Sequence, residues 1–367
     1  MSVTFNFPKF QAGKPSLHVE LKQRINQYFD SKGILPTGNS KLYSKGIILG
    51  IAFLAVYLHL LLITPVWYFA LPECALLGII ISSIGFNVMH DGGHGSFSQS
   101  KHMNIFAAWT INFLGANSFM WNMKHNIIHH SYTNIEGVDD DLEVNGLMRF
   151  APTQEHKKIH QYQYIYFWFL YSMLYIWWVF FTDYKKYFTQ KVGAVPLKKM
   201  NAKNHLDFWL SKALHAFIFI ALPIILCGWF AWLMGFITMG LVAGFGLSIV
   251  FQMAHAMPDN HFPTAIDDSN KMPDEFAVHQ LKTTANFAMN SKVIGWLVGG
   301  LNYQIEHHLF PKVSHVHYPA ISSIVREVCK EYNIAYVSYP TFVQAIKEHV
   351  RYLKIMGQKP VLAYANQ

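Results

Sequence analysis

Two long stretches without a charged residue constrain the fold of this chain more than any other feature. Residues 46–72 and residues 213–258 contain no Asp, Glu, Lys or Arg. A helix needs about 20 predominantly apolar residues to cross the hydrocarbon core of a bilayer. The first stretch is therefore long enough for one span and the second for two. Residues 74–89 form a shorter apolar run, which can become a span if its helix continues to His94. The sequence predicts an all-α integral membrane protein.

The composition supports this prediction and excludes other classes of protein. Of the 367 residues, 52% are hydrophobic and only 14% are charged, whereas charged residues make up about 25% of an ordinary soluble protein. The net charge is +8, but no compact Lys/Arg patch with interleaved aromatics is present, so we expect no nucleic-acid partner. The basic residues instead flank the apolar stretches, which is typical of cytoplasmic segments. The three cysteines form no CxxC pair and predict neither disulfides nor an iron–sulfur site.

Three histidine clusters lie next to the apolar stretches. Neutral imidazole is the commonest metal ligand in proteins, and residues i and i+4 share one face of an α-helix. We therefore expect His90 and His94 to aim two rings at one point, and His125 and His129 to do the same. His130 and His308 then add rings that can reach a second ion. The clusters are His90-Asp91-Gly92-Gly93-His94, His125-Asn126-Ile127-Ile128-His129-His130 and Gln304-Ile305-Glu306-His307-His308.

With these clusters the chain resembles the membrane fatty acyl desaturases. It is most similar to their front-end branch, whose third cluster begins with Gln, as Gln304 does here. The resemblance implies an O2-dependent oxidoreductase with two iron ions. Such an enzyme introduces a cis double bond into an acyl chain carried by CoA or by a lipid, as a linoleoyl-CoA or Δ6 desaturase does in unsaturated fatty acid biosynthesis. The likeness extends to Gly95-Ser96-Phe97, Tyr132-Thr133-Asn134, Asp139-Asp140-Asp141-Leu142 and Leu309-Phe310-Pro311.

Eight histidines are the candidate metal ligands. A single zinc ion takes about four ligands, so eight rings suit two metal ions, and the choice of iron rests on the resemblance. His255 joins the set because it ends a long apolar run and because the family places a ligand at the corresponding point. Gln304 is a further candidate, which could bind metal, hold a ligating water or support a ligand. The eight are His90, His94, His125, His129, His130, His255, His307 and His308.

Four other polar residues are candidates for supporting these ligands. A carboxylate often accepts the second ring N–H of a ligating histidine. Capping and turn formation explain the same residue types equally well. The candidates are Asp91, Asn134, Asp139 and Asp140.

The need for one site decides the membrane topology. All three clusters must lie on the same side, so the ambiguous apolar stretches 102–123 and 162–182 are expected to lie at the interface and not to cross. The second is rich in Tyr, Trp and Phe, which favour membrane interfaces. Turns are expected near Pro72–Glu73 and Gly235, where no Lys or Arg occurs, so both termini and every cluster are expected on the cytoplasmic side. A six-span alternative would place the second cluster opposite the first. The four expected spans are about 46–71, 73–94, 210–233 and 236–255.

The chain is expected to be one functional domain. A cytosolic segment, residues 1–45, precedes a membrane desaturase domain, residues 46–311, and cytosolic helices follow in residues 312–367. Together the ends are expected to form a helical cap that holds the di-iron site. The expected location is a bacterial inner membrane or a membrane like that of the endoplasmic reticulum.

The electron donor is expected to be a separate protein. A fused cytochrome b5 domain needs two axial histidines and on the order of a hundred residues, whereas about 45 residues precede the first span, with His18 as their sole histidine. A ferredoxin or a free cytochrome b5 is expected instead, because an acidic donor would be attracted by the cytoplasmic Lys residues.

Other functions remain open on the sequence. A related di-iron acyl hydroxylase, an acetylenase or a sphingolipid desaturase would carry similar clusters. A zinc-dependent membrane hydrolase would need fewer histidines. A metal transporter would place its histidines inside the spans, whereas these lie beyond the span ends. The sequence does not determine the position of the double bond, the chain length or the acyl carrier.

Overall fold

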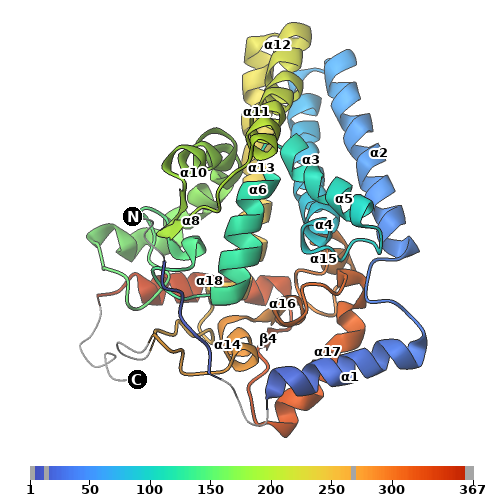
Figure 1. The fold of residues 1–367 in the computed structure, drawn as a ribbon. Helices are drawn as coiled ribbons and strands as arrows, with labels where there is room; N and C mark the ends of the chain where they lie inside the picture. The colour runs from blue at the N-terminus through green and yellow to red at the C-terminus, as the bar shows by residue number, and fades with distance from the viewer. Residues whose placement is uncertain (1–4, 12–15, 266–269, 360–367) are drawn as a thin grey trace.

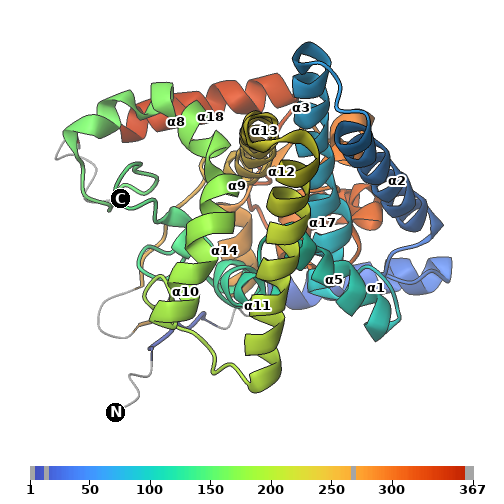
Figure 2. The same cartoon turned by 90° about the horizontal axis from the view of Figure 1, so that it is seen from above.

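The computed structural model describes residues 5–11, 16–265 and 270–359 of the chain. A bundle of long helices stands on a layer of shorter helices, and this layer includes the N-terminal helix α1 (Leu17–Lys32) and the C-terminal segments (Figure 1). Seen from above, the bundle lies over one part of the layer (Figure 2). The expected all-α membrane architecture is confirmed, with short two-residue strands as the exceptions.

Within the residues that the structure describes, four helices are long and apolar enough to cross a membrane. In α2 (Ser40–Leu62), Ile51, Leu58 and Leu62 are exposed, whereas Leu49 and Phe53 on the opposite face are buried against the bundle. Such exposed apolar side chains suit a lipid surrounding. The other spans are α3 with α4 (Trp67–Ile84 and His90–His94, joined by π-helical Gly85–Met89), α11 with α12 (Ala202–Ala216 and Leu222–Cys227, joined by π-helical Phe217–Ala221), and α13 (Trp229–His255).

Both turns between the spans lie earlier in the sequence than expected. The first turn occupies residues 63–66, not Pro72–Glu73, which lie inside α3. A residue before proline is disfavoured in helical conformation, and Thr64, which precedes Pro65, has a positive φ of 46°. The second turn is at Gly228, with φ of 85°, and not at Gly235, which lies inside α13. Glycine adopts such backbone angles without steric cost.

The two ambiguous stretches form short or broken helices. Residues 102–123 give α5 (Lys101–Phe113) and α6 (Ser118–Trp121), which are each too short to span a bilayer. In residues 158–189 the helix is bent by 58° between Ser172 and Leu174; counted as one span, this pair would be a fifth. Its segments are Lys158–Tyr162 (3-10), α8 (Gln163–Ser172), α9 (Leu174–Trp177), π-helical Trp178–Thr182 and α10 (Asp183–Thr189).

Buried polar contacts attach these stretches to the third span. Lys212 of α11 donates to Asp183 at 2.8 Å and to the carbonyl of Gly115 at 2.7 Å, and both members of the ion pair are almost completely buried. Asp207 accepts hydrogen bonds from Trp109 Nε1 and from Asn112 Nδ2. Helices α5 and α10 are therefore held at the side of the bundle, against the middle and the C-terminal turns of α11.

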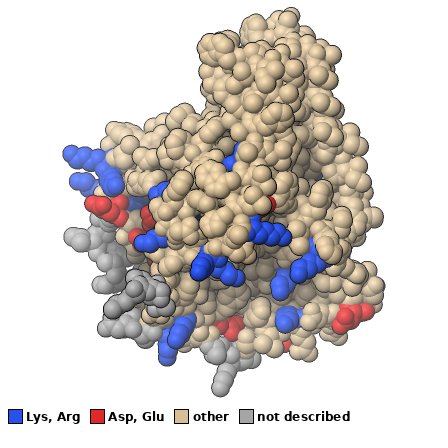
Figure 3. Space-filling view, turned by 45° about the horizontal axis from the view of Figure 1, so that its top comes forward, with Lys and Arg blue, Asp and Glu red and all other residues tan. Residues whose placement is uncertain are grey.

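The remaining elements form the layer below the bundle. α1 and α17 pack together around Leu21, Ile25 and Val325, and α18 packs beneath α8. In Figure 3 the charged side chains gather around this layer and the base of the bundle. The elements are α7 (His130–Tyr132), Asp140–Leu142 (3-10), β1 (Lys191–Val192), β2 (Val195–Pro196), α14 (Phe276–Thr283), β3 (Asn286–Phe287), α15 (Lys292–Leu297), α16 (Gln304–Leu309), His315–His317 (3-10), α17 (Tyr318–Glu331), β4 (Ser338–Tyr339) and α18 (Phe342–Met356); β1 pairs antiparallel with β2, and β3 parallel with β4.

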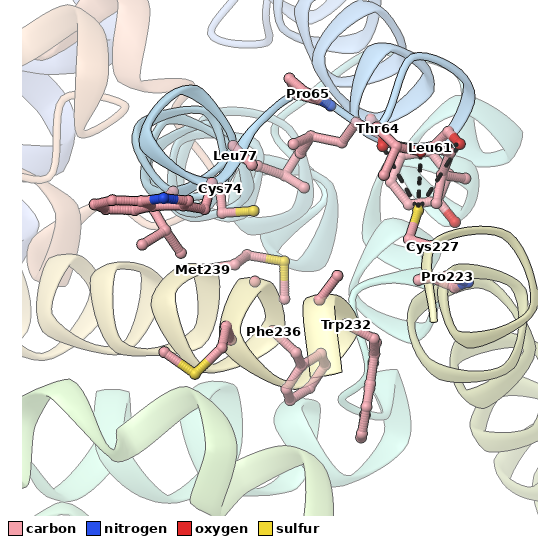
Figure 4. Close-up of a pocket in the computed structure, with 18 of the residues that line it drawn as sticks. Leu61, Thr64, Pro65, Cys74, Leu77, Pro223, Cys227, Trp232, Phe236 and Met239 are labelled. Carbon is pink, nitrogen blue, oxygen red and sulfur yellow. Dashed lines mark hydrogen bonds between the residues drawn. The ribbon is translucent and has the colours of Figure 1, made fainter. Parts of the chain in front are cut away.

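An apolar cavity of about 380 Å³ lies near the opposite ends of the spans from the histidine clusters. Figure 4 shows Leu77 of α3 and Met239 of α13 on facing helices, and Cys227 and Trp232 at the other side of the cavity. Leu77 precedes His94 by 17 residues, so a helix rise of 1.5 Å per residue separates the two by about 25 Å. This cavity is therefore remote from the histidine clusters.

Candidate metal centre

The three histidine clusters of the sequence converge where the bundle meets the layer of shorter helices. His90 and His94 lie on α4, at the end of the second span, and His255 is the last residue of the fourth span, α13. The second cluster lies on the π-helical segment Asn122–His129 and on α7, and the third lies on α16. Candidate ligands that are far apart in sequence are therefore brought together by helix ends.

Five histidines form one group, called here the five-histidine cluster. Each of the five offers a ring nitrogen, and these nitrogens all lie within 4.8 Å of one another. Nε2 of His125 lies 3.1 Å from Nε2 of His90 and 3.1 Å from Nε2 of His130. Ligand nitrogens bound about 2.1 Å from one metal ion would be separated by about 2.9 to 3.4 Å. The members are His90, His94, His125, His130 and His307.

Three other histidines form a second, neighbouring group, called here the three-histidine cluster. His129, His255 and His308 place their ring nitrogens within 4.8 Å of one another, and all three side chains are buried. The ring of His308 stacks on that of His130 with 4.4 Å between centroids, so the two clusters touch. This arrangement offers two adjacent metal positions.

The histidines of the second sequence motif, residues 125–130, are divided between the two groups differently from the i, i+4 expectation. His125 belongs with His130 in one group, whereas His129 belongs to the other. The cause is local: residues 122–129 are π-helical, and a π-helix closes its hydrogen bonds at i+5 and not at i+4. His125 and His130, five residues apart, therefore share a face. The expectation that His125 and His129 aim at one point is wrong. That His130 and His308 both reach a second ion stays a prediction, and their rings stack on one another.

Unsatisfied ring nitrogens show that this donor set fits metal ions. The Nε2 atoms of His94, His129, His255, His307 and His308 are buried and have no hydrogen-bond partner within the described ranges. A buried polar atom without a partner costs free energy, and a metal ion would satisfy several of these atoms at once. Nitrogen-only donors fit zinc as well as iron on ligand type.

Burial also prepares the rings to bind a cation. It lowers the pKa of His125, His130, His307 and His308 well below the ordinary value, so these imidazoles are neutral at pH 7. Burial acts in the same direction on His129, but the carboxylates of Asp139 and Asp141 outweigh it and raise its pKa. Neutral imidazole is the form that binds metal.

Comparison with known proteins identifies the chain. The sequence model of the fatty acid desaturase family matches residues 65–340. The chain belongs to the fatty acid desaturase family. It is 33% identical over 346 residues to the sn-1 linoleoyl-lipid 6-desaturase of Synechocystis, which covers 92% of this chain and 94% of the relative. It is 36% identical over 354 residues to the acyl-lipid (8-3)-desaturase of Physcomitrium patens, covering 94% and 72%. An sn-1 linoleoyl-lipid 6-desaturase of Arthrospira platensis is 33% identical, covering 93% and 92%. The chain is therefore an oxidoreductase.

In this desaturase, one of the four predicted supporting residues directly contacts the ring of a candidate ligand. Asp139 Oδ2 accepts from His129 Nδ1 at 3.0 Å and from the backbone N–H of Asn134 at 2.9 Å. Asp141, which was not selected from the sequence, also lies 3.4 Å from His129 Nδ1. Asp140 instead faces Lys124 and Lys186, at 3.6 and 3.8 Å.

The other two predicted supporting residues act on the backbone and on neighbouring segments. Asp91 accepts a hydrogen bond from Ser314 Oγ at 2.7 Å and lies 3.1 Å from His315 Nδ1. It therefore joins the first sequence motif, residues 90–94, to the segment that follows the third motif, residues 304–308. Asn134 Nδ2 donates to the carbonyl of His255 at 2.9 Å. Gln304 is buried in the first turn of α16, and its side chain makes no hydrogen bond with residues 5–11, 16–265 or 270–359.

Four residues outside the motifs also hold the desaturase histidines. Gln280 accepts from His308 Nδ1 at 2.9 Å, the carbonyl of Thr283 accepts from His255 Nδ1 at 3.3 Å, and Tyr318 OH lies 3.1 Å from His307 Nδ1. Trp121 stacks on His125 with 4.6 Å between centroids, and the missing side chain of Gly93 leaves room for its ring. Gln280 and Thr283 are each 28 residues from their partners and Tyr318 is 11 residues from His307, so no spacing rule points to them. Trp121 precedes His125 by four residues, a spacing that could have indicated the contact.

Proposed function

We propose that the eight histidines bind two iron ions and that the chain is a front-end desaturase of lipid-bound acyl chains. The five-histidine cluster is assigned to one ion and the three-histidine cluster to the other, with Gln304 or a water held by it as the further ligand of the second. The observation that carries this assignment is the convergence of eight buried or half-buried imidazoles in two touching groups, in which five Nε2 atoms have no hydrogen-bond partner among the described residues. A di-iron centre supplies the oxidising power, drawn from O2 and two electrons, that no ordinary side chain provides.

The protein's own contribution is to position and protect this centre. Asp139, Gln280 and the carbonyl of Thr283 each accept a hydrogen bond from Nδ1 of one proposed ligand, which leaves its Nε2 free to bind metal. Burial of the rings excludes water from the reaction, and the span ends bring the site to the depth of acyl chains.

Relatives support an acyl chain carried by a lipid. The relatives in Synechocystis and Arthrospira platensis are named for linoleoyl-lipid and position 6, and their matches cover over nine tenths of both chains. We therefore propose linoleoyl-lipid as the substrate and position 6 as the site of the new cis double bond.

The site is proposed to face the cytoplasm. His129 and His255 have ring centroids 4.7 Å apart, and the two long spans α11–α12 and α13 lie between them in sequence. A crossing by residues 158–189 as well would put the two histidines on opposite sides, so this bent pair is proposed to lie at the interface. Exposed lysines of the connecting segment, Lys185, Lys191, Lys198, Lys199 and Lys203, then follow the positive-inside rule.

Electrons are proposed to come from a separate acidic protein, a ferredoxin or cytochrome b5, that is attracted by these lysines. Weak redox encounters of this kind are steered by charge. Purified enzyme with lipid substrate and O2 should turn over only after the donor and its reductase are added. The rate should fall as salt shortens the screening length to about 8 Å or less. Salt-independent turnover would contradict the steering.

The deciding experiment is product analysis in a host that makes no polyunsaturated fatty acids. Supplied with linoleate, cells expressing the chain should accumulate the 6-desaturated product in membrane lipids, and a labelled pulse should show it there before it appears in acyl-CoA. The His129→Ala variant is the matched control and should make none. A hydroxylated or acetylenic product would favour the related di-iron enzymes, and the absence of any product from iron-loaded protein would refute the proposal.

A further inference from the structure

Helix α14 carries none of the eight histidines, yet its residues contact the three-histidine cluster on the Nδ1 side of the rings. Its Gln280 is completely buried and lies next to His308, and the carbonyl of its last residue, Thr283, faces His255. Its outer face, with Ala277 and Leu281, packs in the core beneath. The helix thus joins that core to two candidate ligands.

The hydrogen bonds around Gln280 fix the direction of its side-chain amide. The carbonyl of His130 can only accept, so the NH2 group of Gln280 donates to it, at 2.9 Å. The amide oxygen of Gln280 must then face His308 Nδ1, at 2.9 Å, and Thr133 Oγ1, at 3.1 Å. The assignment of oxygen and nitrogen follows from these partners alone.

The same geometry fixes the tautomer of His308. An amide oxygen has no hydrogen to donate, so His308 Nδ1 must carry the hydrogen, and Nε2 must carry the lone pair. Thr133 strengthens this constraint, because its one hydroxyl hydrogen already faces two oxygens that can only accept, the carbonyl of His129 at 2.7 Å and the amide oxygen of Gln280 at 3.1 Å, so that Thr133 can only accept from His308. His308 Nε2 is buried and has no hydrogen-bond partner in the part of the chain that the structure describes.

We propose that Gln280 is a positioning residue that selects the metal-binding tautomer of His308 and ties the two clusters together. One amide orients His308, in the three-histidine cluster, and holds the backbone of His130, in the five-histidine cluster. This inference rests on the proposed metal binding. Substitution of Gln280 should weaken the binding of mainly one of the two metal ions, because the three-histidine cluster has fewer ligands to compensate.

The test measures iron(II) binding to the detergent-purified full chain by competition with a chelator. Gln280→Met keeps the length of the side chain and removes both its hydrogen bonds. One of the two irons should then bind about 10- to 100-fold more weakly, the usual effect of removing such a partner. Gln280→Glu should restore much of this loss, because a protonated carboxyl accepts from His308 and donates to the His130 carbonyl. X-ray absorption at the iron edge should show fewer imidazole ligands in Gln280→Met.

Gln163→Met is the matched control. Gln163 is also completely buried and makes three hydrogen bonds with the backbone of Arg149 and Leu353, but it lies outside both clusters. This variant should lower the melting temperature while binding both irons as the wild type does. Wild-type iron affinity in Gln280→Met, or equal iron loss in the two methionine variants, would overturn the inference. If the wild type itself binds no iron, the proposed function fails instead.

Discussion

The two histidine clusters are built in contrasting ways. In the three-histidine cluster every member has its Nδ1 within hydrogen-bonding distance of a non-histidine partner: Asp139, the Thr283 carbonyl or Gln280. In the five-histidine cluster, His307 has such a partner in Tyr318, whereas His125 is positioned by the neighbouring rings and by Trp121. The three-histidine cluster thus has few proposed ligands, each held through its Nδ1, whereas the five-histidine cluster has more proposed ligands that rely on neighbouring rings. The contrast suggests that a site can be specified by the orientation of each ring or by the number of rings.

Deleting one ligand from each cluster tests this difference most strongly. His255→Ala leaves two histidines in its cluster, so the iron content should fall from two to about one per chain, and desaturation should stop. His94→Ala leaves four histidines, which is enough for a tetrahedral ion, so both irons should remain. The measurement is iron per protein after gel filtration.

His349→Ala is the control for this pair of variants. His349 is buried and hydrogen-bonded to Tyr171 and to the carbonyl of Ala256, the residue after His255, but its own ring belongs to neither cluster. It should keep both irons. Equal iron loss in His255→Ala and His94→Ala would show that the division into two clusters has no functional meaning.

Removing a residue that supports a histidine should weaken iron binding more in the three-histidine cluster than in the five-histidine cluster. Asp139→Asn removes the negative charge beside His129 and should weaken one iron by about 10- to 100-fold. Tyr318→Phe removes only the hydroxyl beside His307, which four other histidines surround, so its effect should be within about threefold, or about 0.7 kcal/mol. Chelator competition measures both. A larger effect for Tyr318→Phe would reverse the comparison.

Much of this architecture could be predicted from the sequence because it follows from local rules. Apolar runs predicted four spans, and the three histidine motifs supplied seven of the eight histidines that the structure brings together. The eighth, His255, was found from its place at the end of a long apolar run and from the family resemblance. The turns were misplaced because hydropathy does not distinguish Pro72 inside α3 from the break at Thr64–Pro65. The pairing within the second cluster was wrong because a π-helix has no simple sequence signature.

The supporting residues were harder to predict, for a physical reason. Asp139 lies ten residues from His129, within reach of a local argument. Gln280 is 28 residues from His308 and Thr133 is 147 from Gln280, so only the folded chain brings them together. Asp140 was selected and Asp141 was not, because two adjacent carboxylates in a turn are equivalent until their directions are known.

Gln304 tests whether the three-histidine cluster is short of a ligand. Gln304 precedes His308 by four residues on α16, so the two share a face. Gln304→Ala should lower turnover and iron affinity by about tenfold if the amide binds metal or a ligating water. Gln304→His should retain activity and bind the second iron at least as tightly as the wild type. Unchanged turnover in Gln304→Ala would show that this position is incidental.

The smallest expected effect is that of Asp141, the second carboxylate beside His129 in the three-histidine cluster. Asp141 Oδ2 lies 3.4 Å from His129 Nδ1, and its other oxygen lies 2.6 Å from Lys124 Nζ. This longer, shared contact should support His129 less than Asp139 does at 3.0 Å. Asp141→Asn should therefore weaken iron binding by about threefold, or about 0.7 kcal/mol. Asp140→Asn is the control, because Asp140 faces Lys124 and Lys186 and should leave iron affinity unchanged. If Asp140→Asn weakened iron as much as Asp141→Asn, the loss would come from the lysine contacts of the turn, and direct support of His129 would be limited to Asp139.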